Sequence, residues 1–151
     1  MTGYLLDRDV LSAAEDPNGN RNVHNWIDRI PDRDLYISAV TVMEARKGFS
    51  RQRANAKTDA GKNDILCYEA NFDDILAGFR DRILSVDRPV ADLWGAMLGQ
   101  REANVMDTAL AATATVRGLV VATRNGRDFR GRGRGVRLVD PFKANPSIID
   151  P

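Results

Sequence analysis

Short apolar runs alternate along the chain with longer stretches in which apolar residues recur at helical spacing. The short runs predict buried strands at residues 4–6, 35–40, 82–87, 119–123 and 136–140. The longer stretches predict helices at residues 10–14, 23–30, 65–79, 90–101 and 105–118, and a further polar helix that begins after Ser38 or Thr41. Strands separated by helices indicate an α/β fold, with a central, mostly parallel sheet in a three-layer α/β/α arrangement.

The bulk properties of the chain narrow the class of protein. With 151 residues, we expect a single domain over residues 1–151. The content of 43% hydrophobic and 28% charged residues is typical of a soluble globular protein. A net charge of +1 implies no general attraction to nucleic acid, although 18 of the 22 basic residues are arginines, which suit phosphate oxygens better than lysines.

The supply of cysteine and histidine excludes several kinds of site. Cys67 is the only cysteine, so we expect a buried apolar side chain rather than a disulfide or zinc site, and a reducing compartment, the cytoplasm. His24 is the only histidine and lies in a helical pattern, where an ordinary surface or packing role is expected, so Ser-His-Asp and Cys-His mechanisms lack a base. No phosphate-binding GxxxxGK[ST] or GxGxxG motif occurs.

Four acidic residues lie where parallel strands are expected to end, namely Asp7, Glu44, Asp107 and Asp128. Singly, each has a structural explanation, because Asp7 and Asp128 suit helix caps, Asp107 suits a helix dipole and Thr41-x-x-Glu44 matches a capping box. Together, four carboxylates at one sheet edge would repel one another unless a hard divalent cation were bound. The arrangement therefore indicates Mg²⁺ or Mn²⁺ and hydrolysis of a phosphodiester, with the cation activating water and stabilising the phosphate charge.

The order of motifs resembles a known family. The segments are YLLDRDVLS, LYISAVTVMEARKGF, VMDTALAATATVRGL, VVATRNGRDF and VRLVDPF, and together they span nearly the whole chain. They are similar to PIN-domain proteins of the VapC type, the ribonuclease toxins of bacterial toxin–antitoxin pairs, including the FitB-like branch. The resemblance implies a PIN-like α/β/α domain that cleaves RNA with Mg²⁺ or Mn²⁺.

The same resemblance assigns roles to individual residues and partners. It implies that Asp7, Glu44, Asp107 and Asp128 are the catalytic and metal-binding acids, and that Thr123 and Asn125 line the same pocket. It also implies a homodimer and a small antitoxin protein that silences the site by inserting a peptide, often with an arginine or lysine. The implied substrate is transfer or messenger RNA.

The opening motif departs from the family pattern. Asp7 is followed by Arg8 and Asp9, whereas the family normally has Asp-Thr-Asn or Asp-Thr-Ser. Turned inward, Arg8 would pair with Asp7 and compete with the metal. We expect its side chain to point outward into solvent, because successive side chains leaving a strand point to opposite sides. Asp9 either supplies an additional ligand or caps a helix that begins at Val10, and the cap is the commoner case.

Two basic segments offer contacts to partners. Arg130, Arg132 and Arg134 lie in an RGRGRG sequence close to Asp128, and they either hold RNA phosphates or belong to a solvated loop. The second segment lies in the long helix after the second strand, a region that in this family commonly serves the dimer or the antitoxin. Its residues are Arg46, Lys47, Arg51 and Arg53.

Two alternative functions remain open. An apolar strand that ends in Asp-x-Asp also opens phosphatases of the haloacid dehalogenase type, in which Asp7 would be the nucleophile and Asp9 the acid/base. The lysine and second acidic pair which that family needs are not found in matching positions. The other alternative is a catalytically degenerate PIN domain, altered by Arg8, which only binds an antitoxin.

Overall fold

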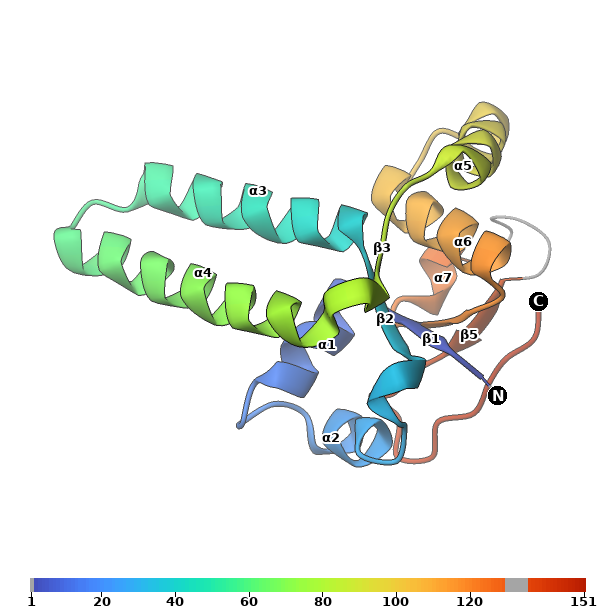
Figure 1. Ribbon diagram of the computed structural model, residues 1–151, viewed down its shortest axis with the longest axis horizontal. Coiled ribbons are helices and arrows are strands. Elements are labelled where there is room, and N and C mark those ends of the chain that lie inside the picture. The colour runs from blue at the N-terminus through green and yellow to red at the C-terminus, as the bar shows by residue number, and fades with distance from the viewer. Residues whose placement is uncertain (1, 130–135) are drawn as a thin grey trace.

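The central sheet has five parallel strands. A computed structural model of the chain describes residues 2–129 and 136–151. The strands are β1 (Tyr4–Leu6), β2 (Leu35–Ser38), β3 (Ile83–Leu84), β4 (Val120–Ala122) and β5 (Arg137–Val139). They lie in the order β3-β2-β1-β4-β5, and each neighbouring pair is parallel. The predicted parallel sheet is therefore confirmed, with β1 at its centre (Figure 1).

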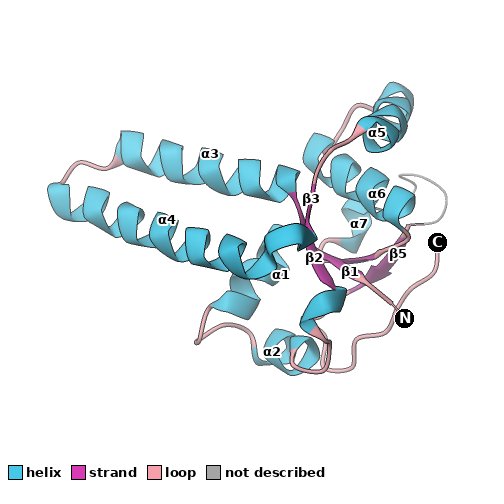
Figure 2. Cartoon of the chain, viewed as in Figure 1, coloured by secondary structure: helices cyan, strands magenta, loops and turns pink. Residues whose placement is uncertain are grey.

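Helices connect the strands and cover both faces of the sheet (Figure 2). They are α1 (Arg8–Glu15), α2 (Arg21–Ile27), α3 (Ala39–Asn55), α4 (Asp59–Phe79), α5 (Arg88–Gln100), α6 (Val105–Arg117) and the short α7 (Gly126–Phe129), with 3-10 turns at Asp32–Asp34 and Arg80–Arg82. α6 ends at Gly118, whose φ of 67° is the left-handed conformation that favours glycine. Within the described residues, no helix is long and apolar enough to cross a membrane.

Alternate residues of the strands supply two separate hydrophobic cores. Leu6 and Ile37 pack into a core with α1, α2, α3 and α4, whereas Leu5 and Val121 pack into a core with α5 and α6. The period of two follows from the pleat, which directs successive side chains to opposite faces. Two cores around one sheet confirm the predicted three-layer α/β/α arrangement.

α3 and α4 form an antiparallel pair that extends well beyond the sheet (Figure 1). Ion pairs join the two helices, between Arg46 and Asp73 and between Arg53 and Glu69. These two arginines of the second basic segment are therefore held by acids of the same chain.

Two expectations about single side chains have opposite outcomes. The His24 imidazole is half-buried and lies 2.8 Å from the Ala13 carbonyl oxygen, across the junction between α1 and α2, which agrees with the predicted surface or packing role. The prediction that Cys67 is buried is wrong, because its side chain is exposed on α4. Residue 67 lies on the side of α4 that faces away from the core residues Ile65 and Phe72.

We expect Ala111→Leu to destabilise the fold by about 1–3 kcal/mol, because an enlarged side chain overpacks a filled core. Ala111 is fully buried, in a run of small residues that brings α6 close to the sheet. Chemical denaturation of the purified protein measures the change. Ala91→Leu on the exposed side of α5 is the matched control and should change stability little. An equal loss in both variants would contradict the packing argument.

Candidate active site

The topology brings three strand ends and several helix starts to one edge of the sheet. Asp7 follows the central strand β1, α3 begins directly after β2, and Thr123 follows β4. α6 is followed by β4 after the turn at Gly118, so the last turn of α6 lies near the start of β4. The first turn of α6, which contains Asp107, therefore lies toward the edge where β4 ends. Sites in parallel α/β sheets form at this edge, outside the carboxyl ends of the strands.

The Asp7 carboxylate is 9% exposed and has a hydrogen bond on each oxygen. Its Oδ1 accepts the Arg8 backbone N–H at 2.7 Å, which makes Asp7 the cap of α1. Its Oδ2 accepts the Thr123 hydroxyl at 2.7 Å, and the Thr123 Oγ1 in turn accepts the Asn125 backbone N–H at 3.0 Å. Thr123 thus links β4 to the carboxylate at the end of β1.

The pKa of Asp7 is raised above its ordinary value of 3.8. Burial is the largest cause; the hydrogen bonds from Thr123 and Arg8 act in the opposite direction, and the charges of Asp9 and Asp128 raise the pKa further. The ionised carboxylate is therefore less favourable here than in water, despite its two donors.

Glu44 is the second acid at this edge. α3 begins at Ala39 with the Ser38 hydroxyl accepting the Val40 N–H at 3.0 Å, so Ser38 is the cap and the alternative Thr41-x-x-Glu44 capping box does not form. Glu44 accordingly lies in the second helical turn, half-buried. Burial, followed by the charge of Asp7, raises the pKa of Glu44, while the positive charges of Arg8 and Lys47 lower it.

Arg8 packs along α3 rather than extending into solvent. One of its guanidinium nitrogens lies 3.4 Å from the Glu44 carbonyl oxygen. A Cβ at Gly48 would lie 3.0 Å from Nη2 of Arg8, so the guanidinium fills the space that a side chain at position 48 would occupy. The prediction that Arg8 points outward is therefore wrong, but within the described residues it forms no ion pair with Asp7 either.

Asp9 is exposed in the first turn of α1. The prediction that it caps a helix starting at Val10 is wrong, because Asp7 caps α1 and the helix begins at Arg8. Its negative charge nevertheless raises the pKa of both Asp7 and Glu44. Its role as an additional ligand stays a prediction.

Asp128 and Asp107 lie on the two helices that flank β4 in the chain, α7 after it and α6 before it. Asp128 is half-buried in α7 and its Oδ1 accepts a hydrogen bond from the Asn104 side-chain amide at 3.2 Å. Asn104 has a left-handed backbone, with φ 47° and ψ 55°, immediately before α6. Asp107 is half-buried in the first turn of α6. Asn104, which the sequence analysis did not single out, therefore connects the start of α6 to α7.

The charges of Asp9 and Asp128 raise the pKa of Asp7, and those of Asp7 and Asp9 raise the pKa of Glu44. Within the described residues, however, no three His, Cys, Asp or Glu side chains are close enough to hold one metal ion. Carboxylate oxygens are the donors that hard divalent cations prefer, so the residue types fit such an ion. Arg130, Arg132 and Arg134, the predicted RNA contacts, lie outside the described residues.

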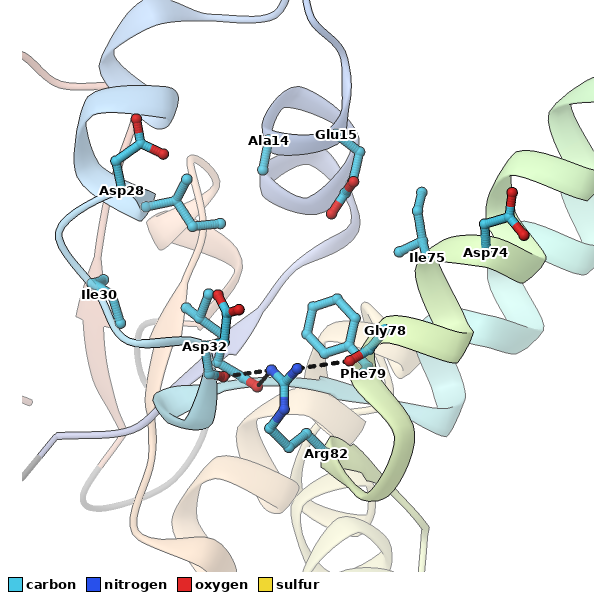
Figure 3. Close-up of a pocket in the computed structure, with 12 residues that line it drawn as sticks. Ala14, Glu15, Asp28, Ile30, Asp32, Asp74, Ile75, Gly78, Phe79 and Arg82 are labelled. Carbon is cyan, nitrogen blue, oxygen red and sulfur yellow. Dashed lines mark hydrogen bonds between the residues drawn. The ribbon is translucent and has the colours of Figure 1, made fainter.

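A separate pocket of about 570 Å³ lies at the start of β2, away from the carboxyl ends of the strands. The Arg82 guanidinium is fixed there by the carbonyl oxygens of Asp32, Leu35 and Gly78 (Figure 3). Burial raises the pKa of Glu15 at its rim. This pocket lacks all four predicted catalytic acids.

Known proteins resemble this chain over most of its length. Toxin FitB of Neisseria gonorrhoeae is 35% identical over 130 residues, which cover 83% of this chain and 89% of that protein. The VapC ribonuclease Y4jK of Sinorhizobium fredii is 28% identical over 144 residues, covering 92% of this chain and 97% of that protein.

Solved structures of other proteins also resemble this chain. FitAcB from Neisseria gonorrhoeae superposes with a TM-score of 0.73 at 33% identity, covering 92% of this chain and 98% of that chain. FitAB bound to an IR36 DNA fragment gives a TM-score of 0.74 at 31% identity, covering 94% and 97%. The family model for the PIN domain matches residues 4–134. The predicted resemblance is thus confirmed, and the chain belongs to the PIN domain family.

Proposed function

We propose that this protein is the toxin of a toxin–antitoxin pair and acts as an endoribonuclease that requires Mg²⁺ or Mn²⁺. The observation that carries the proposal is the Asp7 carboxylate, buried at the end of the central strand with its pKa raised by burial and by neighbouring acids. A buried carboxylate beside other acids lowers the stability of the fold, so a functional role is the better explanation for its presence. The names of the relatives, a toxin and a ribonuclease, support the assignment.

The residues fit a divalent cation of the magnesium type. Magnesium commonly binds one or two carboxylates directly and keeps several waters, so a site of this kind needs no group of three acids in direct contact. Asp7 and Asp107 would hold the ion, and Asp128 would complete its surroundings. When bound, such an ion lowers the pKa of water and stabilises the charge that develops on a phosphate.

The acids of the chain itself have distinct roles in this proposal. The raised pKa of Glu44 suits a residue that orients a water molecule and accepts its proton. Thr123 holds Asp7 in one orientation through its hydroxyl. Attack of that water on the phosphorus, in line with the leaving 3′ oxygen, would give a 5′-phosphate and a 3′-hydroxyl.

The partners follow from the same assignment. We propose a small antitoxin protein as the cognate partner, because the similar solved structures include the FitAB complex, and a basic antitoxin side chain in the acidic site would offset the charge of Asp7. A homodimer is proposed as the assembled form. The exposed Leu66 and Tyr68 of α4, 53% and 56% accessible, are surface that such an assembly would cover.

Neither alternative function gains support from the geometry. Asp9, the acid/base of the phosphatase hypothesis, is exposed and lies within a helical turn. The degenerate-domain hypothesis depended on Arg8 disabling Asp7, but the Arg8 side chain is engaged with α3. The nuclease is the function that the site supports best.

The decisive experiment is cleavage of a labelled RNA by the purified, antitoxin-free protein with Mg²⁺ or Mn²⁺. We expect Asp7→Asn and Asp107→Asn each to reduce the cleavage rate at least about a hundredfold, because each removes a charge that holds the ion. EDTA should abolish wild-type cleavage. Asp92→Asn, which alters an exposed acid of α5, is the matched control and should cleave normally. Full activity of both site variants, or activity in EDTA, would disprove the proposal.

A second prediction concerns the stability of the acidic site. Because its pKa is raised above 3.8, Asp7 binds a proton more tightly in the folded than in the unfolded chain. Ionisation of Asp7 therefore lowers the free energy of unfolding as the pH rises above that value. In EDTA at pH 7, Asp7→Asn should therefore have a higher thermal midpoint than wild type, since asparagine can still cap α1. The difference should shrink toward pH 4.

Calorimetric scans at several pH values would measure this difference. Saturating Mg²⁺ should raise the wild-type midpoint more than that of the variant, because only the wild type keeps the full ligand set. A variant that is less stable than wild type at pH 7 would show that the carboxylate stabilises the fold, contrary to the argument.

A further inference from the structure

A pocket of about 750 Å³ adjoins the acidic site on the β5 side of the sheet. It shares Thr123 with the site, and Gly126, Arg127 and Phe129 of α7 line it. Asp128, in the middle of the same short helix, bonds instead to Asn104. α7 therefore contributes an acid to the proposed catalytic edge and a wall to the pocket, so the two are adjacent.

The wall of the pocket is largely apolar. Phe129, Val136, Leu138 and Ile149 line it, and Ile149 is held against β5 by two backbone hydrogen bonds with Leu138, of 3.0 and 2.7 Å. The first three of these side chains are at most 8% exposed, so the wall is formed by the core itself. The volume lies within the range of about 300–1,000 Å³ found for sites that bind small organic ligands.

Cationic side chains stand at the mouth of the pocket. Arg124, Arg127 and Lys143 line it and are exposed. The Arg124 guanidinium lies 3.9 Å from the centre of the Phe142 ring, which restricts its position. Two acids, Asp140 and Asp150, also line the pocket, so among its described lining residues the three cations outnumber the acids by one; the Asp140 carboxylate accepts the Phe142 backbone N–H at 3.0 Å, which holds it in a turn.

An apolar wall, exposed cations and a position next to the proposed phosphodiester-cleaving edge together fit one class of ligand, a nucleotide. Single-stranded RNA is commonly bound with an unstacked base against apolar or aromatic side chains and its phosphate near arginine. We propose that this pocket binds a nucleotide that flanks the cleaved phosphodiester, with its base against the apolar wall and its phosphate near Arg124 and Arg127. The inference rests on the proposed ribonuclease function and adds a substrate-positioning site to it.

Gly126 provides a way to fill the pocket. A Cβ there would meet only the Cδ1 of Leu138, at 3.8 Å, an ordinary contact, and the backbone is not left-handed. Gly126→Ala should consequently fold normally and leave the pocket open, whereas the longer side chain of Gly126→Met would occupy the pocket. Arg127→Gln removes a cation at an exposed position and is the second variant.

The test measures binding of a fluorescent single-stranded RNA in EDTA, with Asp7→Asn as the background so that the RNA stays intact. We expect Gly126→Met to weaken the affinity about tenfold and Arg127→Gln several-fold, the size expected for one base and one phosphate contact. Gly126→Ala should bind as the background does. Arg88→Gln on α5, whose side chain is 91% accessible, is the matched control for the loss of an exposed arginine.

The outcomes separate this inference from the proposed function. Unchanged affinity in both Gly126→Met and Arg127→Gln, with thermal midpoints near the background, would overturn the nucleotide pocket while the nuclease assignment stands. If the wild type never cleaves RNA but Gly126→Met still weakens binding, the pocket is supported and the nuclease assignment fails. A similar loss in Arg88→Gln would show general charge attraction and overturn the pocket.

Discussion

The carboxylate of Asp7 is the feature on which the site depends. It is buried at the end of the central strand, where the backbone N–H of Arg8 and the hydroxyl of Thr123 each donate a hydrogen bond. These donors offset only part of the cost of burial, because the pKa of the group remains raised. The fold therefore fixes the position of a carboxylate whose ionised form is only partly stabilised by the protein. A bound cation would supply the stabilisation that is missing.

The order of the strands determines which groups surround that charge. β1 lies between β2 and β4, so α3, which carries Glu44, follows on one side, and Thr123 and Asp128 follow on the other. A different order would separate the same residues while leaving every local element intact. Since strand order arises from pairing between distant segments, local sequence patterns cannot determine it, and the sequence predicted a mostly parallel sheet without an order for its strands.

The sequence was most informative where local chemistry has one solution. The apolar runs before Asp7 and Thr123 became β1 and β4, and Gly118 ended α6 as its left-handed conformation requires. The sequence left two local solutions open where both are chemically suitable. Ser38 and Thr41 can both cap a helix, and in the structure β2 ends at Ser38, which caps α3. No local sequence pattern indicated a role for Asn104, because its hydrogen bond to Asp128 joins two segments that are far apart in the sequence.

The substitution at Arg8 is best understood together with Gly48. A Cβ at position 48 would lie 3.0 Å from the Arg8 guanidinium, a tight contact, so the glycine leaves room for this arginine to lie along α3 without a shift. In that position its positive charge lowers the pKa of Glu44, against the effects of burial and of Asp7. Arg8 thus offsets part of the acidic repulsion from beside the site rather than from within it. The carboxylate of Asp7 keeps its own two donors, and the departure from the family motif leaves the central acid in place.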